Sequence, residues 1–229
     1  AIPIQVPVVV PPTPIEGLHV LPAGPTAEVT LGSADPKSNY MMQVDLVRWG
    51  AAYQKITLSQ YTERVTDESR YVVAESVKGQ RGLERYPFAA QRVSINDSEG
   101  ILLEDKAWTL AASDTSFAEY RLTIAGTDNT PVLEIVRRYE LAEGSYSLDC
   151  QQHLINHTGE PIKVVFRQSL QGDIYLTKGG YLGDQRKFVT GYFNPEFDPA
   201  QEIVFVDEAF RLRNEVVEDK DIWPNTDLK

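Results

Sequence analysis

The fold class is decided by YSLDCQQHLINHTGEPIKVVFRQSL, residues 146–170. Apolar residues alternate with polar ones on both sides of a central run, 156–161, that is rich in turn-forming residues; they are Tyr146, Leu148 and Cys150 before the run and Ile162, Val164 and Phe166 after it. A period of two is the pattern of a half-buried β-strand. Because Asn, Gly and Pro favour turns, the stretch predicts two antiparallel strands joined as a hairpin.

The same period of two recurs along most of the chain, and each occurrence is bounded by Gly, Asn, Asp or Pro. The further predicted strands are 42–47, 55–58, 70–74, 91–95, 107–110, 118–124, 133–141, 187–191 and 202–205. Helical spacing is confined to about 207–222, where Asp207 is placed to cap a short helix. Many strands without alternating helices predict an all-β, mainly antiparallel sandwich with a short C-terminal helix.

Length and charge limit the function. A chain of 229 residues can bury a sizeable core without disulfides or metals. The net charge of −11, from 22 Lys and Arg against 33 Asp and Glu, gives the chain no electrostatic basis for binding nucleic acid or anionic lipid surfaces. Cys150 is the only cysteine, so it forms no internal disulfide and leaves the redox compartment undetermined.

The N-terminal residues 1–27 carry seven of the fourteen prolines. Such a density of prolines favours extended backbone, so this segment is expected to be a tether. His19 is expected to lie in an unstructured part of it. The end of the tether is expected to be free or to lie along the domain as an edge segment. The apolar stretch 6–10 is interrupted by Pro7 and falls far short of the ~20 residues that cross a bilayer. No signal peptide is visible, and the sequence is expected to be a mature form or an excised piece.

The opening of the predicted domain carries a recognisable motif. The run TLGSADPKSNY at 30–40 precedes a strand that ends in RWGAA at 48–52. This combination resembles the periplasmic, first extracytoplasmic domain of the YidC membrane-protein insertases. The likeness covers most of residues 29–192 and continues through YPFAA at 86–90, Trp108, RYEL at 138–141, the run 156–161 and GDQR at 183–186.

The resemblance implies a fold, a location and partners. It implies that residues 28–229 form a β-supersandwich similar to galactose mutarotases, between two membrane helices and on the periplasmic side of the bacterial inner membrane. It implies a noncatalytic interaction or positioning module for membrane-protein insertion and folding, a chaperone-like role in protein transport. The implied partners are the membrane-embedded remainder of the same chain, translocon components and segments of substrate proteins. The family's insertion groove is membrane-embedded, so none of its residues carries over.

Few residues suggest chemistry of their own. His153 and His157 are spaced like metal ligands on a helix, but here they fall on a strand and a turn without a third ligand. A mutarotase-like sugar-binding or aldose-epimerising protein, the alternative function, needs an acid and a base, and His153 with Glu202 or Asp207 is the available pairing. Cys150 shares the apolar face, so it is interpreted as a core thiol rather than a nucleophile. No catalytic residue, cofactor or metal site is predicted; an adhesin-like sandwich is a third reading.

Aromatic residues suggest core and partner contacts. Trp49 and Trp108 are predicted to fill the sandwich core. The residues proposed to contact a partner are Phe210, Val217 and Trp223, in and after the expected helix.

The pair Arg137 and Arg138 places one arginine on each face of its strand. One of the two is therefore expected to be exposed or held in an ion pair. A structural ion pair is the default interpretation.

Overall fold

The computed structural model describes residues 13–25, 27–66, 68–78, 84–169, 187–194 and 201–208, and for the last two ranges the backbone alone. All elements in these ranges are strands, and all strand pairs are antiparallel. The predicted all-β, mainly antiparallel class is therefore confirmed. No described segment forms a helix suited to crossing a membrane.

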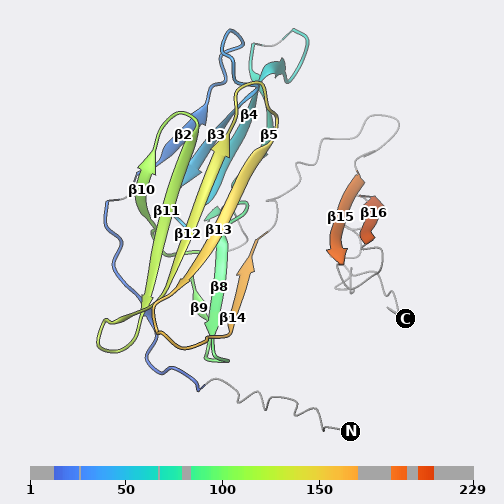
Figure 1. The fold of residues 1–229 in the computed structure, drawn as a ribbon. Helices are drawn as coiled ribbons and strands as arrows, with labels where there is room; N and C mark the ends of the chain where they lie inside the picture. The colour runs from blue at the N-terminus through green and yellow to red at the C-terminus, as the bar shows by residue number, and fades with distance from the viewer. Residues whose placement is uncertain are drawn as a thin grey trace, which may run out of the picture. The chain divides into compact units, whose positions relative to one another are not determined.

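The first layer is a five-stranded sheet in the order β1-β11-β12-β13, with β10 also pairing with β11 (Figure 1). Its strands are β1 (His19–Val20), β10 (Thr109–Ser113), β11 (Phe117–Ala125), β12 (Pro131–Leu141) and β13 (Leu148–Asn156). The long pair β11 and β12 forms the centre of this layer. Every second residue of β11 from Ala118 to Ile124 is buried, as its period of two predicts.

The second layer consists of two smaller sheets. One has the order β2-β3-β4-β5 and comprises β2 (Val29–Gly32), β3 (Met42–Val47), β4 (Ala52–Thr62) and β5 (Arg70–Glu75). The other has the order β14-β8-β9 and comprises β8 (Ala90–Ile95), β9 (Ile101–Leu102) and β14 (Val164–Gln168). Both pack against the five-stranded sheet through one hydrophobic cluster, which makes the arrangement a sandwich. The more specific likeness to galactose mutarotases stays a prediction.

Two further strand pairs complete the described elements. The pair β6 (Val77–Lys78) and β7 (Glu84–Arg85) follows β5. The pair β15 (Lys187–Asn194) and β16 (Gln201–Glu208) belongs to a second compact unit, 175–229, and confirms the strands predicted at 187–191 and 202–205. Asp207 lies in β16 rather than at a helix cap, and 209–222 lies outside the described residues.

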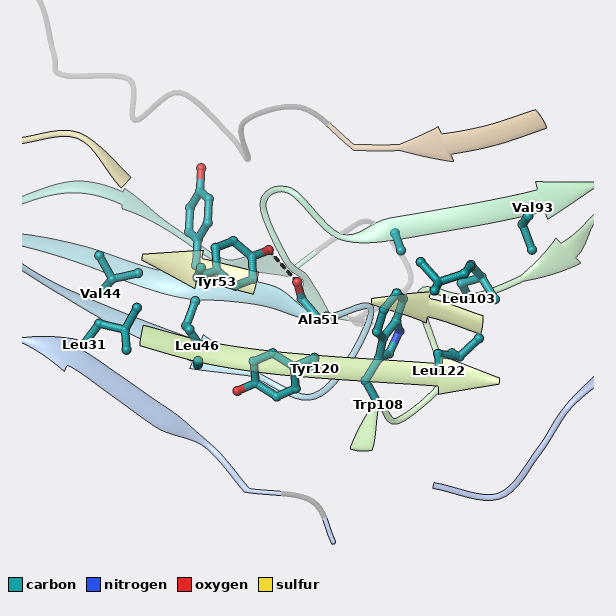
Figure 2. Close-up of a cluster of buried hydrophobic side chains, with 14 of the residues drawn as sticks. Leu31, Val44, Leu46, Ala51, Tyr53, Val93, Leu103, Trp108, Tyr120 and Leu122 are labelled. Atoms are coloured by element: carbon teal, nitrogen blue, oxygen red, sulfur yellow. Dashed lines mark hydrogen bonds between the residues drawn. The ribbon is translucent and has the colours of Figure 1, made fainter. Parts of the chain in front are cut away.

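Large side chains from all three sheets meet in the core (Figure 2). The fully buried ones include Leu31, Leu46, Ile95, Leu103, Trp108, Tyr120, Ile135 and Tyr139. Removing a side chain of this size from water contributes about 1.5–3 kcal/mol, so these residues dominate the stability of the sandwich.

The predicted hairpin at 146–170 is wrong, although both of its strands exist. β13 pairs with β12 over the register Leu133↔Asn156 to Leu141↔Leu148, whereas β14 pairs with β8. The connecting run therefore carries the chain from one layer to the other. At the far end of the run, Lys163 N donates to the Asn96 side-chain oxygen at 2.9 Å, a contact that joins the start of β14 to the end of β8. An alternating pattern fixes the buried face of a strand and leaves its pairing partner open.

The end of the proline-rich segment lies along the five-stranded sheet. β1 pairs with the end of β11, and Leu110 N donates to Pro25 O at 2.9 Å. The imidazole of His19 contacts Gly17 O at 3.1 Å and the side-chain oxygen of Asn129 at 3.0 Å. The expectation that His19 is unstructured is therefore wrong, and its neighbours form an edge segment.

The opening motif is explained by one close approach and one turn. Gly32 has φ +66°, and a β-carbon there would meet Met42 O and, at 2.7 Å, the Cδ2 of Leu141. The turn that follows is closed by Asp35, whose side chain accepts from Lys37 N at 2.9 Å and whose carbonyl accepts from Ser38 N at 3.0 Å. Both features demand particular residue types.

Replacing Gly32 with alanine tests this close approach. Gly32→Ala should lower the free energy of unfolding by about 2–5 kcal/mol, because left-handed backbone strain and overpacking add together. Gly144→Ala is the matched control, since Gly144 has φ +71° with no atom within 4 Å of an added β-carbon. Urea titration should show that Gly144→Ala lowers the free energy of unfolding by only about 1–2 kcal/mol, from backbone strain alone. Equal losses in the two variants would contradict the packing argument.

Candidate functional site

The most unusual buried group is the guanidinium of Arg137 on β12, which is fully shielded from solvent. Its Nη1 donates to the backbone oxygens of Phe88 at 2.8 Å and Ala51 at 3.1 Å. Its Nη2 donates to the side-chain oxygens of Gln152 at 2.9 Å and Gln168 at 2.8 Å. A desolvated cation is costly unless it is hydrogen-bonded, and these acceptors supply that compensation.

Unusual backbone conformations aim these carbonyls at the cation. Gly50, Ala51 and Phe88 have φ of 62°, 44° and 64°. A non-glycine residue in this region costs about 1–3 kcal/mol, so charge-assisted hydrogen bonds must offset strain at two positions. Ala90 N donates to Gly50 O at 2.9 Å, which joins the two strained turns where the sheets of the second layer meet.

Arg137 is surrounded by aromatic rings instead of carboxylates. Its guanidinium carbon lies 5.4 Å from the ring centre of Phe88, 5.7 Å from that of Trp108 and 5.8 Å from that of Phe166. None of the ion pairs formed among the described side chains includes Arg137. Both terminal nitrogens are occupied and the group is buried, so its chemistry is that of a structural clamp between layers.

The neighbouring Arg138 points to the opposite face and carries the predicted ion pair. Its Nη1 lies 3.7 Å from a carboxylate oxygen of Glu119, and its Nε donates to Glu140. The expectation that one arginine is salt-bridged is confirmed for Arg138. The alternation along the strand placed the two arginines on opposite faces. It did not indicate that Arg137 would be the buried one, with carbonyl and amide oxygens as its acceptors.

The histidines do not converge on a reactive group within the described part of the chain. His153 is exposed on β13, and the Nε2 of His157 lies 3.5 Å from a Glu134 carboxylate oxygen. In that part no group of three or more His, Cys, Asp or Glu side chains is arranged to hold a metal ion. The side chains of Glu202 and Asp207, the partners proposed for His153, lie outside the described ones.

Cys150 is half-buried and packs against the core cluster opposite Tyr139, which agrees with its predicted place on the apolar face of its strand. Burial raises the pKa of the Cys150 thiol, an effect that exceeds the opposing influence of the Arg137 charge and of a hydrogen bond with Tyr139. A raised pKa reduces the thiolate fraction, which is the reactive form.

Of the two tryptophans predicted to fill the core, the structure buries one. Trp108 is fully buried in the core, as predicted. Trp49 is half-buried and stacks with Arg48, whose guanidinium carbon lies 4.7 Å from its ring centre, so the core prediction is wrong for Trp49. The partner-contact residues Phe210, Val217 and Trp223 lie outside the described residues.

Several exposed apolar side chains lie on or beside the terminal strands of both layers. β13 and β5 are the terminal strands of their sheets as far as the structure describes them, and Figure 1 draws them on the same side of the sandwich. Ring centres of Tyr61, near the end of β4, and Tyr146, just before β13, lie 6.4 Å apart, so side chains of the two layers meet at this point. We call the outer borders of β13 and β5 the open edge; the exposed apolar residues on these strands or next to them are Tyr61, Tyr71, Val73, Tyr146, Leu154 and Ile155. The consecutive apolar pair Leu154 and Ile155 breaks the alternation of β13, and sequence reasoning missed this edge although that pair could have indicated it.

Comparison with known proteins gives one match. A family model described as the YidC periplasmic domain matches residues 35–197. No curated protein and no solved structure gave a significant match to the chain.

Replacing Arg137 tests its role as a clamp. Arg137→Leu should lower the free energy of unfolding by about 3–5 kcal/mol, because its buried acceptors lose their donor. Arg138→Leu removes an arginine from the solvent-facing side of the same strand, and it should lower the free energy of unfolding by no more than about 1 kcal/mol. Urea titration followed by tryptophan fluorescence measures both, and similar losses would refute the clamp.

The burial of Cys150 can be tested by labelling with a thiol reagent at pH 8. Because burial both raises the thiol pKa and blocks access, we expect native protein to react at least about tenfold more slowly than protein unfolded in urea. Fast labelling of the folded chain would show an activated thiol instead.

Proposed function

The chain belongs to the YidC periplasmic domain family, and on that premise we propose that it is a noncatalytic interaction or positioning module for membrane-protein insertion. The family places the domain on the extracytoplasmic side of the inner membrane, with the remainder of the same chain embedded in the membrane. The proposed further partners are translocon components and exported segments of substrate proteins.

The open edge is the observation that carries this proposal. A terminal strand offers unpaired backbone N–H and C=O groups to an extended segment, which adds to the sheet as a further strand. Leu154 and Ile155 are 43% and 39% exposed on β13, and such side chains supply apolar contact beside the new strand. Backbone pairing makes little demand on sequence, which suits a module that meets many different substrates.

The alternative, a sugar-binding or aldose-epimerising protein, has less support. Epimerisation needs an acid and a base on opposite sides of a sugar ring. His153 is exposed at a sheet edge, and no carboxylate of a described side chain pairs with it. Arg137, the most strongly bonded polar group, is engaged with the protein itself and is closed to a substrate.

Strand addition can be tested by titrating the ¹⁵N-labelled chain with unfolded substrate segments. We expect saturable shifts of β13 backbone amides, and a loss of at least about tenfold in affinity in Leu154→Lys/Ile155→Lys, because charge blocks edge pairing. Val65→Lys is the control, since Val65 is fully exposed in a loop after β4. Unshifted β13 amides would rule out strand addition, and aldose turnover by the chain would favour the alternative.

A further inference from the structure

Two arginines face each other on the outer side of the small sheet β14-β8-β9. Arg167 on β14 is the register partner of Arg92 on β8, and Val165 is the partner of Ser94. Their strand neighbours Val93, Val164 and Phe166 pack into the core, so both arginines project to the solvent side. Like charges opposite each other on a sheet repel, and this arrangement costs stability unless an anion lies between them.

The arginines line a shallow depression. It has a volume of about 230 Å³ and is lined by Arg92, Ser94, Asp97, Ser98, Val165 and Arg167. The described side chains provide no ion pair to Arg92 or Arg167. Asp97 is the one carboxylate in the lining, and its Oδ1 is paired with Lys163 Nζ at 2.7 Å. Among the described side chains, two cations without an ion pair thus line one depression in a chain of net charge −11.

Gly100 makes room for this arrangement. A β-carbon at Gly100 would lie 2.5 Å from Cδ and 2.8 Å from Cγ of Arg92, and 2.8 Å from Oγ of Ser94. The missing side chain lets the Arg92 stem and the Ser94 hydroxyl lie against the backbone of the loop before β9.

A tight turn forms the rim of the depression. Asn96 and Asp97 have φ of 51° and 58°, and Ser98 N donates to Ile95 O at 3.0 Å. The buried Asn96 side chain accepts from Lys163 N at 2.9 Å and donates to Thr13 O at 2.9 Å, which fixes the turn to β14 and to the N-terminal segment. Ser98 Oγ accepts from Ile95 N at 3.2 Å, so its own hydroxyl hydrogen is available to a ligand.

We propose that the Arg92–Arg167 depression binds a phosphate group, as a monoester, a diester or the free ion. Two guanidinium groups and two serine hydroxyls match the charge and the several acceptor oxygens of phosphate, whereas a carboxylate offers only two oxygens. The net charge of the chain weakens long-range attraction, but at contact the two cations act within a Debye length of the ligand. This proposal does not depend on strand addition at the open edge.

Two sources of the phosphate are distinguishable. Val165 and Leu102, which flank the arginines, are 44% and 49% exposed, and they provide an apolar border that fits a phospholipid better than a free ion. A headgroup phosphate held by the arginines would then leave acyl chains near these two side chains.

The test is an NMR titration of the full chain with sodium phosphate and, separately, with short-chain phosphatidylglycerol below its micelle concentration. We expect saturable shifts at Ser94, Ser98 and the arginine Nε–H groups, with at least about tenfold weaker binding in Arg92→Gln and Arg167→Gln. Arg64→Gln, which removes an exposed arginine far along the chain from this sheet, should bind as the parent chain does. Gly100→Ala keeps both charges and should weaken binding by crowding Arg92.

Tighter binding of phosphatidylglycerol than of phosphate would identify the lipid headgroup as the source, and equal binding would identify the phosphate ion alone as sufficient. The proposal is overturned if sodium chloride at matched ionic strength gives the same shifts, or if the arginine variants bind unchanged. Amide spectra of each variant establish that it is folded.

Discussion

The sandwich depends on the desolvated guanidinium of Arg137. A buried cation without a carboxylate partner is tolerated only when nearly all of its donors are satisfied. Here the acceptors come from both strained turns of the second layer and from strands β13 and β14, so the cation sets the position of four separate segments. Its Nε, like the Nε1 of Trp108, has no hydrogen-bond acceptor among the described groups, so the compensation is not complete.

This clamp explains the backbone strain at two turns of the second layer. The turns at Ala51 and Phe88 adopt left-handed conformations that ordinary residues avoid. In those conformations their carbonyls accept from Arg137, and the energy of these charge-assisted hydrogen bonds offsets the strain. The Tyr139 hydroxyl also donates to Ala51 O, which adds a neutral hydrogen bond to the same acceptor.

The sequence predicted the strands well and their partners poorly. Apolar and polar residues alternate along a strand because its two faces differ in burial. This local relation is why β3, β11 and β12 were predicted from the sequence. β14 pairs with β8, a strand distant in the sequence, and the adjoining hydrogen bond from Lys163 N to the Asn96 side chain is equally nonlocal, so no local pattern encodes this pairing. Alternation along the strand placed Arg137 and Arg138 on opposite faces. Which of the two arginines is buried depends on hydrogen-bond acceptors that other segments supply.

The candidate surfaces were harder to predict for the same reason. The two apolar residues at the end of β13 are visible in the sequence, whereas their exposure follows from the absence of a further strand beside them in the described part of the chain. Arg92 and Arg167 stand opposite each other only because of the register between β8 and β14. Neither strand alone carries a pattern typical of an anion site.

The clamp also links the two proposed binding surfaces physically. Gln152 on β13 and Gln168 on β14 accept from the same Nη2 of Arg137, although the two strands belong to different sheets. A segment that adds to β13 therefore meets a strand whose position is fixed from the core side, since displacing β13 would break a charge-assisted hydrogen bond. For the proposed strand addition, preorganisation of this kind lowers the ordering cost of binding, because β13 needs no local unfolding to pair with a further strand.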